Sequence, residues 1–231
     1  MAEFDRVAAA YDAALAHALA VSGESAEYFA RTRLIYLRSC LDALGVRVRS
    51  VLDFGCGIGS GTALLGDLLG AQEVLGVDVS SRSIELARER CPDARFLTLD
   101  DYTPGGDIDL VFCNGVFHHV PPAERQAALG VVFRALRPGG LFAFWENNPW
   151  NPGARYVMAR CEFDADAKMI SPPAAMRIVR MAGLRPMQVR FLFIFPRILR
   201  PLRRLEAGVA RLPIGAQYQV LSEKPRRWEP A

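Results

Sequence analysis

The sequence predicts an α/β fold with one doubly wound, mostly parallel β-sheet of seven strands. Two observations predict it: short apolar runs alternate with stretches of helical spacing, and a glycine-rich turn follows the first apolar run. Helical crossovers between consecutive strands imply parallel pairing, because a tight turn cannot join parallel neighbours. The expected strands are residues 50–54, 73–77, 95–99, 108–113, 140–146, 188–195 and 217–222.

The composition is that of one globular domain. The 231 residues are 51% hydrophobic and 23% charged, which is enough apolar material for a full core and leaves little length for a second domain. We expect a single domain over residues 1–231. It divides into a helical cover over 1–44, a ligand-binding core over 45–148, and a C-terminal part over 149–231 that lengthens the last strand connection.

Targeting and redox features predict a cytoplasmic protein. The first five residues lack a basic region before an apolar core, and no apolar run approaches the roughly 18 residues that span a bilayer. The five cysteines show no Cys-x-x-Cys spacing and lie mostly in apolar segments. We therefore interpret them as reduced, structural thiols.

The turn after the first strand predicts a binding site for a nucleoside. Gly55, Gly57 and Gly59 let the backbone turn sharply and approach a ligand without Cβ clashes. A dinucleotide fingerprint would have glycine at position 60, where this chain has Ser60. Asp53, two residues before the first glycine, would repel a pyrophosphate but suits an amine-bearing ligand.

A second carboxylate supports the same interpretation. Asp78 ends the next apolar strand, where it can accept both hydrogen bonds of a ribose diol. Together, Asp53 and Asp78 predict a site for an adenosine that carries an amino acid.

On these residues the sequence resembles the class I S-adenosylmethionine-dependent methyltransferases, in particular those acting on small molecules. Segments 96–101, 110–120 and 136–141 resemble that family's later motifs, and the resemblance covers about residues 45–148. It implies a Rossmann-like fold with an antiparallel pair of last strands, and S-adenosylmethionine as cofactor with S-adenosylhomocysteine as product. The cofactor-binding residues it implies are Asp53, Gly55, Cys56, Gly57, Gly59, Asp78, Val79, Asp100, Asp101, Tyr102, Asn114, Phe117 and Tyr11.

Residues 1–44 are expected to form two helices with a break near Ser22–Gly23. In the resembling family such helices cover the cofactor, which gives Tyr11 a place at the methyl-transfer site and Arg33 one at the cofactor carboxylate. The alternatives are that Tyr11 packs on an amphipathic helix and that Arg33 is a surface charge.

Two clusters after the fourth and fifth strands are candidates for chemistry. His118 and His119 can each accept a proton near neutral pH, so they are candidate catalytic bases; the alternative is that one packs beneath the site. Glu146 and Asn147 end the fifth strand, where ligands bind in open parallel sheets. The segment 145–152 either contacts the acceptor or forms a turn scaffold.

We expect neither a metal nor nucleic acid. Catechol-type relatives bind a cation through an Asp after strand four, where this chain has Asn114, and no zinc spacing is present. The net charge of +3 is small for tracking phosphates. The basic segment 196–205 is interpreted as a solvated face, with weak contact to anionic lipid as the alternative.

The predicted function is methyl transfer from S-adenosylmethionine to oxygen or nitrogen of a small-molecule acceptor, such as a metabolite, sugar derivative or lipid headgroup. Two alternatives stay open: an NAD-dependent oxidoreductase and a catalytically silent S-adenosylmethionine-binding subunit. The acceptor and the oligomeric state do not follow from the sequence.

Overall fold

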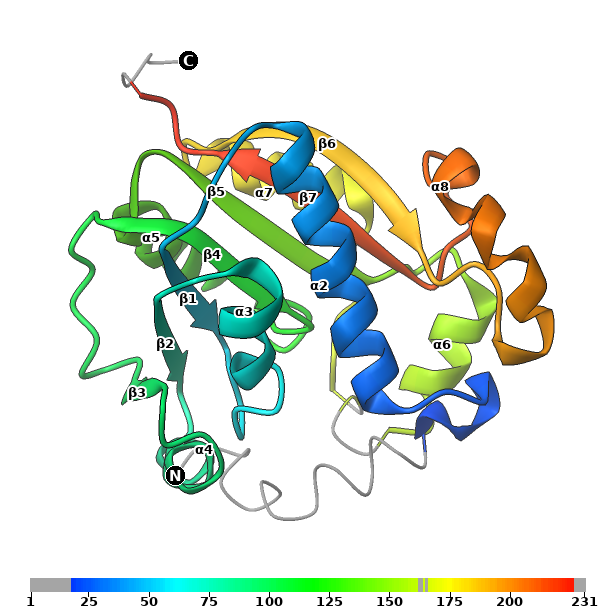
Figure 1. The fold of residues 1–231 in the computed structure, drawn as a ribbon, viewed down its shortest axis with the longest axis horizontal. Coiled ribbons are helices and arrows are strands. Elements are labelled where there is room, and N and C mark those ends of the chain that lie inside the picture. The colour runs from blue at the N-terminus through cyan, green and yellow to red at the C-terminus, as the bar shows by residue number, and fades with distance from the viewer. Residues whose placement is uncertain (1–17, 162–163, 165, 227–231) are drawn as a thin grey trace.

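The computed structural model describes residues 18–161, 164 and 166–226. One seven-stranded sheet has the order β3-β2-β1-β4-β5-β7-β6 (Figure 1). The strands are β1 (Ser50–Phe54), β2 (Glu73–Asp78), β3 (Arg95–Thr98), β4 (Ile108–Asn114), β5 (Leu136–Asn147), β6 (Arg185–Leu192) and β7 (Gln217–Glu223). The helices are η3 (Ala20–Ser22), α2 (Ala26–Ala43), α3 (Thr62–Leu69), α4 (Ser81–Arg90), α5 (Arg125–Ala135), α6 (Pro152–Met158), α7 (Pro172–Met181), η5 (Arg197–Leu205) and α8 (Glu206–Val209).

The predicted fold class is confirmed. β1 pairs in parallel with β2 and β4, and β4 pairs in parallel with β5, as the helical crossovers require. β7 runs antiparallel between β5 and β6, so the last two strands form the expected antiparallel pair. The carboxyl ends of β1, β2 and β4 therefore meet at one edge of the sheet.

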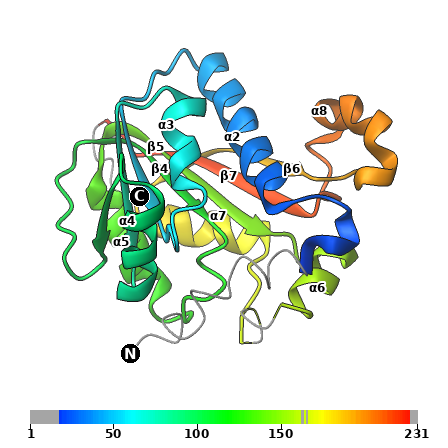
Figure 2. The same cartoon turned by 60° about the horizontal axis from the view of Figure 1, so that its bottom comes forward.

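Helices cover both faces of this sheet, as Figures 1 and 2 show. On one face α2 and α3 pack with Leu110 and Phe112 of β4. On the other face α5 and α7 pack with Val111 and Cys113 of the same strand. Because consecutive residues of a strand point to opposite faces, the middle of this central strand, residues 110–113, is apolar on both sides.

The N-terminal cover is described from residue 18 onward. Gly23 ends η3 with a φ of 75°, which confirms the predicted break. The Ser25 hydroxyl then caps α2 by accepting from the Tyr28 N–H at 3.1 Å. Most of the first predicted helix, including Tyr11, lies outside the described residues.

Two strands, β5 and β6, differ from the prediction by three residues or more at one end or both, and the other boundaries agree within one residue. β6 begins at Arg185 and ends at Leu192, three residues before the expected bounds at each end. Phe193 has a φ of 61°, which breaks the extended backbone there. Pro186 is tolerated because β6 is an edge strand and its register shifts at that point. β5 begins at Leu136 rather than residue 140, because Leu136 already pairs with Ile108 across an irregularity in the ladder.

The basic segment forms a 3-10 helix, η5, beside η3 and α6. Its backbone is kinked at Leu199 and it contains Pro201. Ile198 is 87% exposed. Among the described residues no helix is both long and apolar enough to cross a membrane.

Candidate functional site

The glycine turn is held against β2 by its backbone. The N–H groups of Gly55 and Cys56 both donate to the carbonyl of Val77, at 2.8 and 3.0 Å. Gly57 has a φ of 53°, and a Cβ built on it would meet no atom within 4 Å. The turn therefore presents backbone to open space, as a ligand cradle requires.

Asp78 is fixed directly over that turn. Its carboxylate accepts from the Gly57 N–H and from the Ser80 N–H, each at 2.9 Å. Ser80 in turn caps α4 by accepting from the Ser83 N–H. These contacts hold the carboxylate at the carboxyl end of β2, beside the turn of the neighbouring strand.

Asp53 lies deeper than Asp78. Its side chain is 5% exposed and accepts from the Thr62 hydroxyl at 2.6 Å, at the start of α3. Burial raises the pKa of Asp53 to about 6, against the opposing hydrogen bond from Thr62. Asp53 therefore joins the glycine turn to α3.

The edge beyond β2 carries the third group of predicted residues. Thr98, the last residue of β3, pairs with Asp78 and donates its hydroxyl to Asp101 at 2.6 Å. Asp100 and Asp101 are exposed, as is Val79, while Tyr102 is half-buried and burial raises its pKa to about 12. The structure thus gathers these side chains near the carboxyl ends of β2 and β3.

Asn114 ends β4 and supplies an unsatisfied acceptor. Its buried Oδ1 atom has no hydrogen-bond partner among the described residues. Leaving such a group unpaired costs about 1–3 kcal/mol, so a ligand donor is favoured there. The open space over Gly57, the fixed carboxylate of Asp78 and the Asn114 oxygen together fit a nucleoside that carries an amine.

Two other predicted residues are buried. Phe117 is fully buried and stacks against Phe54 and Phe144 in the core, with ring centroids 6.2 and 5.2 Å away. Cys56 is 9% exposed, and burial raises the pKa of its thiol. Their side chains support the cradle from the protein side.

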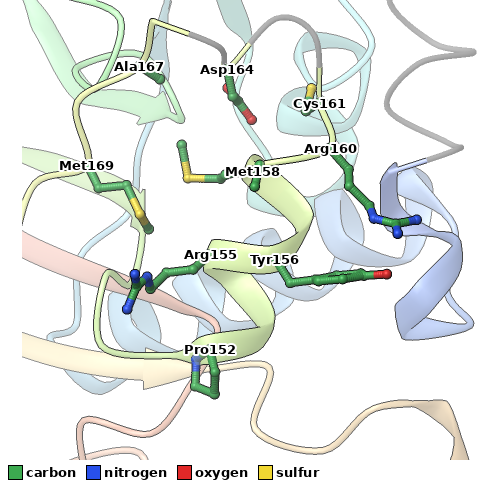
Figure 3. Close-up of a pocket in the computed structure, with 10 residues that line it drawn as sticks. Pro152, Arg155, Tyr156, Met158, Arg160, Cys161, Asp164, Ala167 and Met169 are labelled. Atoms are coloured by element: carbon green, nitrogen blue, oxygen red, sulfur yellow. The ribbon is translucent and has the colours of Figure 1, made fainter.

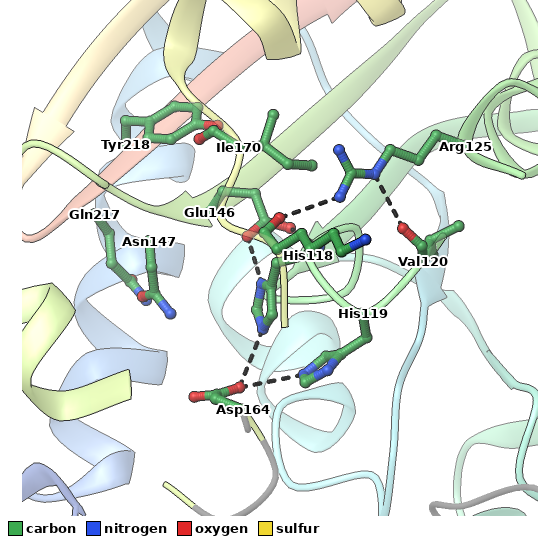
Figure 4. Close-up of polar contacts among 11 residues, drawn as sticks. His118, His119, Val120, Arg125, Glu146, Asn147, Asp164, Ile170, Gln217 and Tyr218 are labelled. Carbon is green, nitrogen blue, oxygen red and sulfur yellow. Dashed lines mark hydrogen bonds and ion pairs between the residues drawn. The ribbon is translucent and has the colours of Figure 1, made fainter. Parts of the chain in front are cut away.

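A second polar cluster joins the ends of β4 and β5 (Figure 4). The His118 Nδ1 atom lies 2.6 Å from the Glu146 carboxylate, which also accepts from the His118 backbone N–H. The Nε2 atoms of His118 and His119 each lie 3.3 Å from Asp164 Oδ1. Burial opposes the charged form of His118, but Glu146 and Asp164 outweigh it and raise its pKa to about 10.

Tertiary contacts bring Asp164 to the histidines. The Lys168 N–H donates to the His118 carbonyl at 2.8 Å, and the Tyr218 hydroxyl donates to the Ile170 carbonyl at 2.8 Å. Arg125 donates to the carbonyls of Val120 and Lys168, which ties the two loops together. These hydrogen bonds hold the segment that follows α6 against the loop that follows β4.

A cavity of about 410 Å³ opens beside this cluster. Its polar end includes Asn114, His118, His119 and Asp164. Most of the remaining wall is apolar and comes from η3, α2, α6 and the segment between β6 and η5, for example Phe29, Val157, Phe193 and Phe195. Asn114 lies between this cavity and the glycine cradle.

Three side chains in the wall of the cavity are linked by hydrogen bonds. Arg33 of α2 donates to Gln217 of β7 at 2.8 Å, and Gln217 donates to Asn147 of β5 at 3.0 Å. Arg33 is only 9% exposed, so it is not the surface charge of the alternative interpretation.

A second hollow of about 640 Å³ lies along α6 (Figure 3). Arg155, Tyr156 and Met169 line it, and it shares Asp164 with the first cavity. None of its lining residues belongs to the glycine cradle.

Comparison with known proteins agrees with this geometry. A family model described as a methyltransferase domain matches residues 51–140. A trans-aconitate 2-methyltransferase of Methylobacterium radiotolerans is 34% identical over 137 residues, which is 58% of this chain and 52% of that protein. Another trans-aconitate 2-methyltransferase, from Rhodopseudomonas palustris, is 40% identical over 97 residues, which is 41% of this chain and 37% of that protein. The chain thus spans about half or less of the length of these relatives.

Solved structures show the same fold. A methyltransferase of Thermotoga maritima, titled a possible histamine N-methyltransferase, has a TM-score of 0.64 at 19% identity, with 96% of this chain and 98% of that chain covered. A TehB-like methyltransferase of Corynebacterium glutamicum has a TM-score of 0.58 at 21% identity, with 90% and 92% covered. Residues 51–140 are thus similar in sequence to a methyltransferase domain, and the fold is that of S-adenosylmethionine-dependent methyltransferases. These similarities indicate S-adenosylmethionine rather than NAD as the cofactor.

The residues at the end of β5 and after it have two different roles. Asn148 donates to the carbonyls of Pro213 and Gly215, and the Asn151 side chain caps α6. These two amides form the turn scaffold. Glu146 instead holds His118, and Asn147 lines the cavity.

Sequence reasoning missed two residues of the candidate site. Asp164 belongs to no motif and follows no expected strand, so only the tertiary contacts of its loop reveal it. Gln217 was the expected start of the last strand, but its partner Arg33 is 184 residues away in the chain.

Proposed function

We propose that this protein is a class I methyltransferase that transfers the methyl group of S-adenosylmethionine to oxygen or nitrogen of a small-molecule acceptor bound in the 410 Å³ cavity. The observation that carries this proposal is the position of Asn114. It ends β4 beside the cradle and also lines the cavity, so cofactor and acceptor would meet across it. Pockets of this size with an apolar wall and a few polar groups suit small molecules.

The cofactor would be held by residues of the cradle. Asp78 would accept hydrogen bonds from the ribose hydroxyls, and Asn114 would accept one from the amine of the ligand. At Gly57, which has no side chain, the ligand could lie close to the protein backbone. When bound, the cofactor supplies an already activated methyl group. The chain therefore has to orient the acceptor and exclude water, which requires little covalent chemistry.

The polar end of the cavity would hold the reacting group of the acceptor. We propose that His118 and His119 face that group and that the apolar wall holds the rest of the molecule. His118 is held by carboxylates at both ring nitrogens, whereas His119 contacts Asp164 through Nε2 and is more exposed. The named activity of the curated relatives makes trans-aconitate, whose carboxylate needs no base, the first acceptor to test.

The first experiment is calorimetric titration of the full chain with S-adenosylhomocysteine, S-adenosylmethionine and NAD. We expect the two sulfur nucleosides to bind and NAD not to bind. A methyl-transfer assay with labelled cofactor then follows over trans-aconitate, other small carboxylates, phenols and amines. Turnover of one class supports the proposal, while nucleoside binding without any turnover supports the silent-subunit alternative.

Three further expectations from the sequence stay predictions. They are a cytoplasmic location, the absence of a nucleic-acid substrate, and a weak lipid contact of segment 196–205.

A further inference from the structure

The cluster at the polar end of the cavity has the ligand set of a metal site. We propose that His118, His119 and Asp164 bind one divalent transition-metal ion. A role of that ion in acceptor binding rests on the proposed function, whereas the binding of the ion to these three residues does not. The sequence predicts no metal, because Asn114 stands where metal-binding relatives have an Asp and because no zinc spacing is present. That prediction leaves out Asp164, which lies far from the histidines in the chain.

The distances favour a shared cation between these groups. The two Nε2 atoms each lie 3.3 Å from Asp164 Oδ1, and the three ligand atoms all lie within 4.8 Å of one another. A charge-assisted N–H···O bond is usually about 2.7–2.9 Å long, so these pairs are long for direct bonds. Two ligand atoms that each lie about 2.0–2.1 Å from a tetrahedral ion are about 3.3 Å apart, which is the distance of each histidine nitrogen from Asp164 Oδ1. The two histidine nitrogens, which lie within 4.8 Å of each other, would move closer together on binding the ion.

Glu146 supports the proposed ligand His118 through the other nitrogen of its ring. Its carboxylate lies 2.6 Å from His118 Nδ1 and is 1% exposed, so it fixes a proton on that nitrogen and turns Nε2 toward Asp164. A carboxylate behind a ligating histidine is the usual support of a metal site. The Lys168 N–H further fixes the His118 backbone.

The ligand types select the ion. Two imidazoles and one carboxylate suit Zn²⁺, Fe²⁺ or Co²⁺ rather than Mg²⁺ or Ca²⁺, which prefer oxygen ligands. All three residues line the 410 Å³ cavity, so a fourth position faces the proposed acceptor. An acceptor oxygen, from a hydroxyl or a carboxylate, would occupy that position.

The test uses the full chain after removal of metal by chelation. Zn²⁺ is titrated by calorimetry, and Co²⁺ is added while the visible spectrum is recorded. We expect one ion per chain and a Co²⁺ band typical of tetrahedral coordination. Asp164→Asn and His119→Gln should each weaken Zn²⁺ binding at least tenfold. Asp166→Asn, an exposed position in the same loop, is the matched control and should bind Zn²⁺ like the unchanged chain.

Glu146→Gln tests the supporting contact. It should weaken Zn²⁺ binding about 10- to 100-fold while the Co²⁺ band keeps its tetrahedral form. If Zn²⁺ fails to bind, or if Asp164→Asn and Asp166→Asn bind it equally, the proposal is wrong and a proton on His118 holds the cluster together. Circular dichroism of each variant separates loss of metal from loss of fold.

Failure of the metal site is distinguishable from failure of the proposed function. S-adenosylhomocysteine is titrated into the same variants, because the cradle residues are separate from the three ligands. Nucleoside binding and methyl transfer without Zn²⁺ binding would overturn only the metal site. Zn²⁺ binding with no methyl transfer to any acceptor would overturn only the function.

Discussion

Glu146 and His118 form a buried pair, 2.6 Å apart, that joins the ends of β5 and β4. The two side chains are 1% and 4% exposed, so solvent screens them little. The pair therefore makes the candidate site part of the folded core, and several measurable consequences follow from it and from the cradle.

Replacing Glu146 by Ala should destabilise the protein by about 3–5 kcal/mol, because the charged and buried His118 then keeps only its longer contact with Asp164. Urea unfolding followed by circular dichroism measures this loss. Glu85→Ala is the control, since Glu85 forms an exposed pair with Arg82 and should change stability by less than about 1 kcal/mol. Equal effects of the two substitutions would contradict the structural role of Glu146.

Asp78→Ala should lower the affinity for S-adenosylhomocysteine by about 10- to 100-fold. The substitution removes the proposed ribose acceptor and releases the Gly57 and Ser80 N–H groups, and a hydrogen bond to a charged group contributes about 1.5–3 kcal/mol. Calorimetry measures the change. Asp67→Ala, on the exposed side of α3, should leave binding as it is; unchanged affinity in Asp78→Ala would remove Asp78 from the site.

Asp53 should make the unliganded protein less stable as the pH rises. Its pKa is raised from 3.8 to about 6, so between those values the folded state keeps a proton that the unfolded state has lost. Protonated Asp53 therefore contributes about 3 kcal/mol to the free energy of unfolding below pH 3.8. This contribution is lost as the pH rises through about 6. Asp53→Asn should lack this step, so the difference between the two stability–pH curves is the measurement. Parallel curves would show that Asp53 does not titrate in this range.

The η5 segment should bind weakly to vesicles that contain anionic lipid and not to neutral ones. Ile198 and Leu205 are 87% and 54% exposed beside arginine residues, and each basic residue near such a surface contributes about 1 kcal/mol. Co-sedimentation measures binding. Ile198→Glu should reduce it, whereas Met181→Glu, at an exposed apolar residue of α7, should not. Absence of sedimentation with either vesicle would leave the segment a solvated basic face.

The sequence predicts the arrangement of the glycine turn and its two carboxylates because the signals for it are local. Gly55, Gly57 and Asp53 lie within five residues, and Asp78 follows at the end of the neighbouring strand, so the strand pattern alone places them together. The sheet order follows from the same alternation. These features depend on short-range conformational preferences that one sequence displays directly.

The second half of the site depends on contacts that the sequence does not display. Asp164 reaches His118 only because Lys168 and Ile170 are bound by residues of distant elements. The end of β6 was misjudged for a related reason: Phe193 adopts a left-handed backbone conformation that its apolar surroundings in the sequence do not indicate. Tertiary packing decides both.

The position of β7 also has a consequence for synthesis of the chain. Among the described strands β6 is hydrogen-bonded to β7 alone, and β7 is the later of the two in the chain. During translation β6 therefore has no strand to pair with until β7, Gln217–Glu223, has left the ribosome. The α2 residue Arg33 meets its Gln217 partner at that same late moment, so the wall of the cavity is completed last.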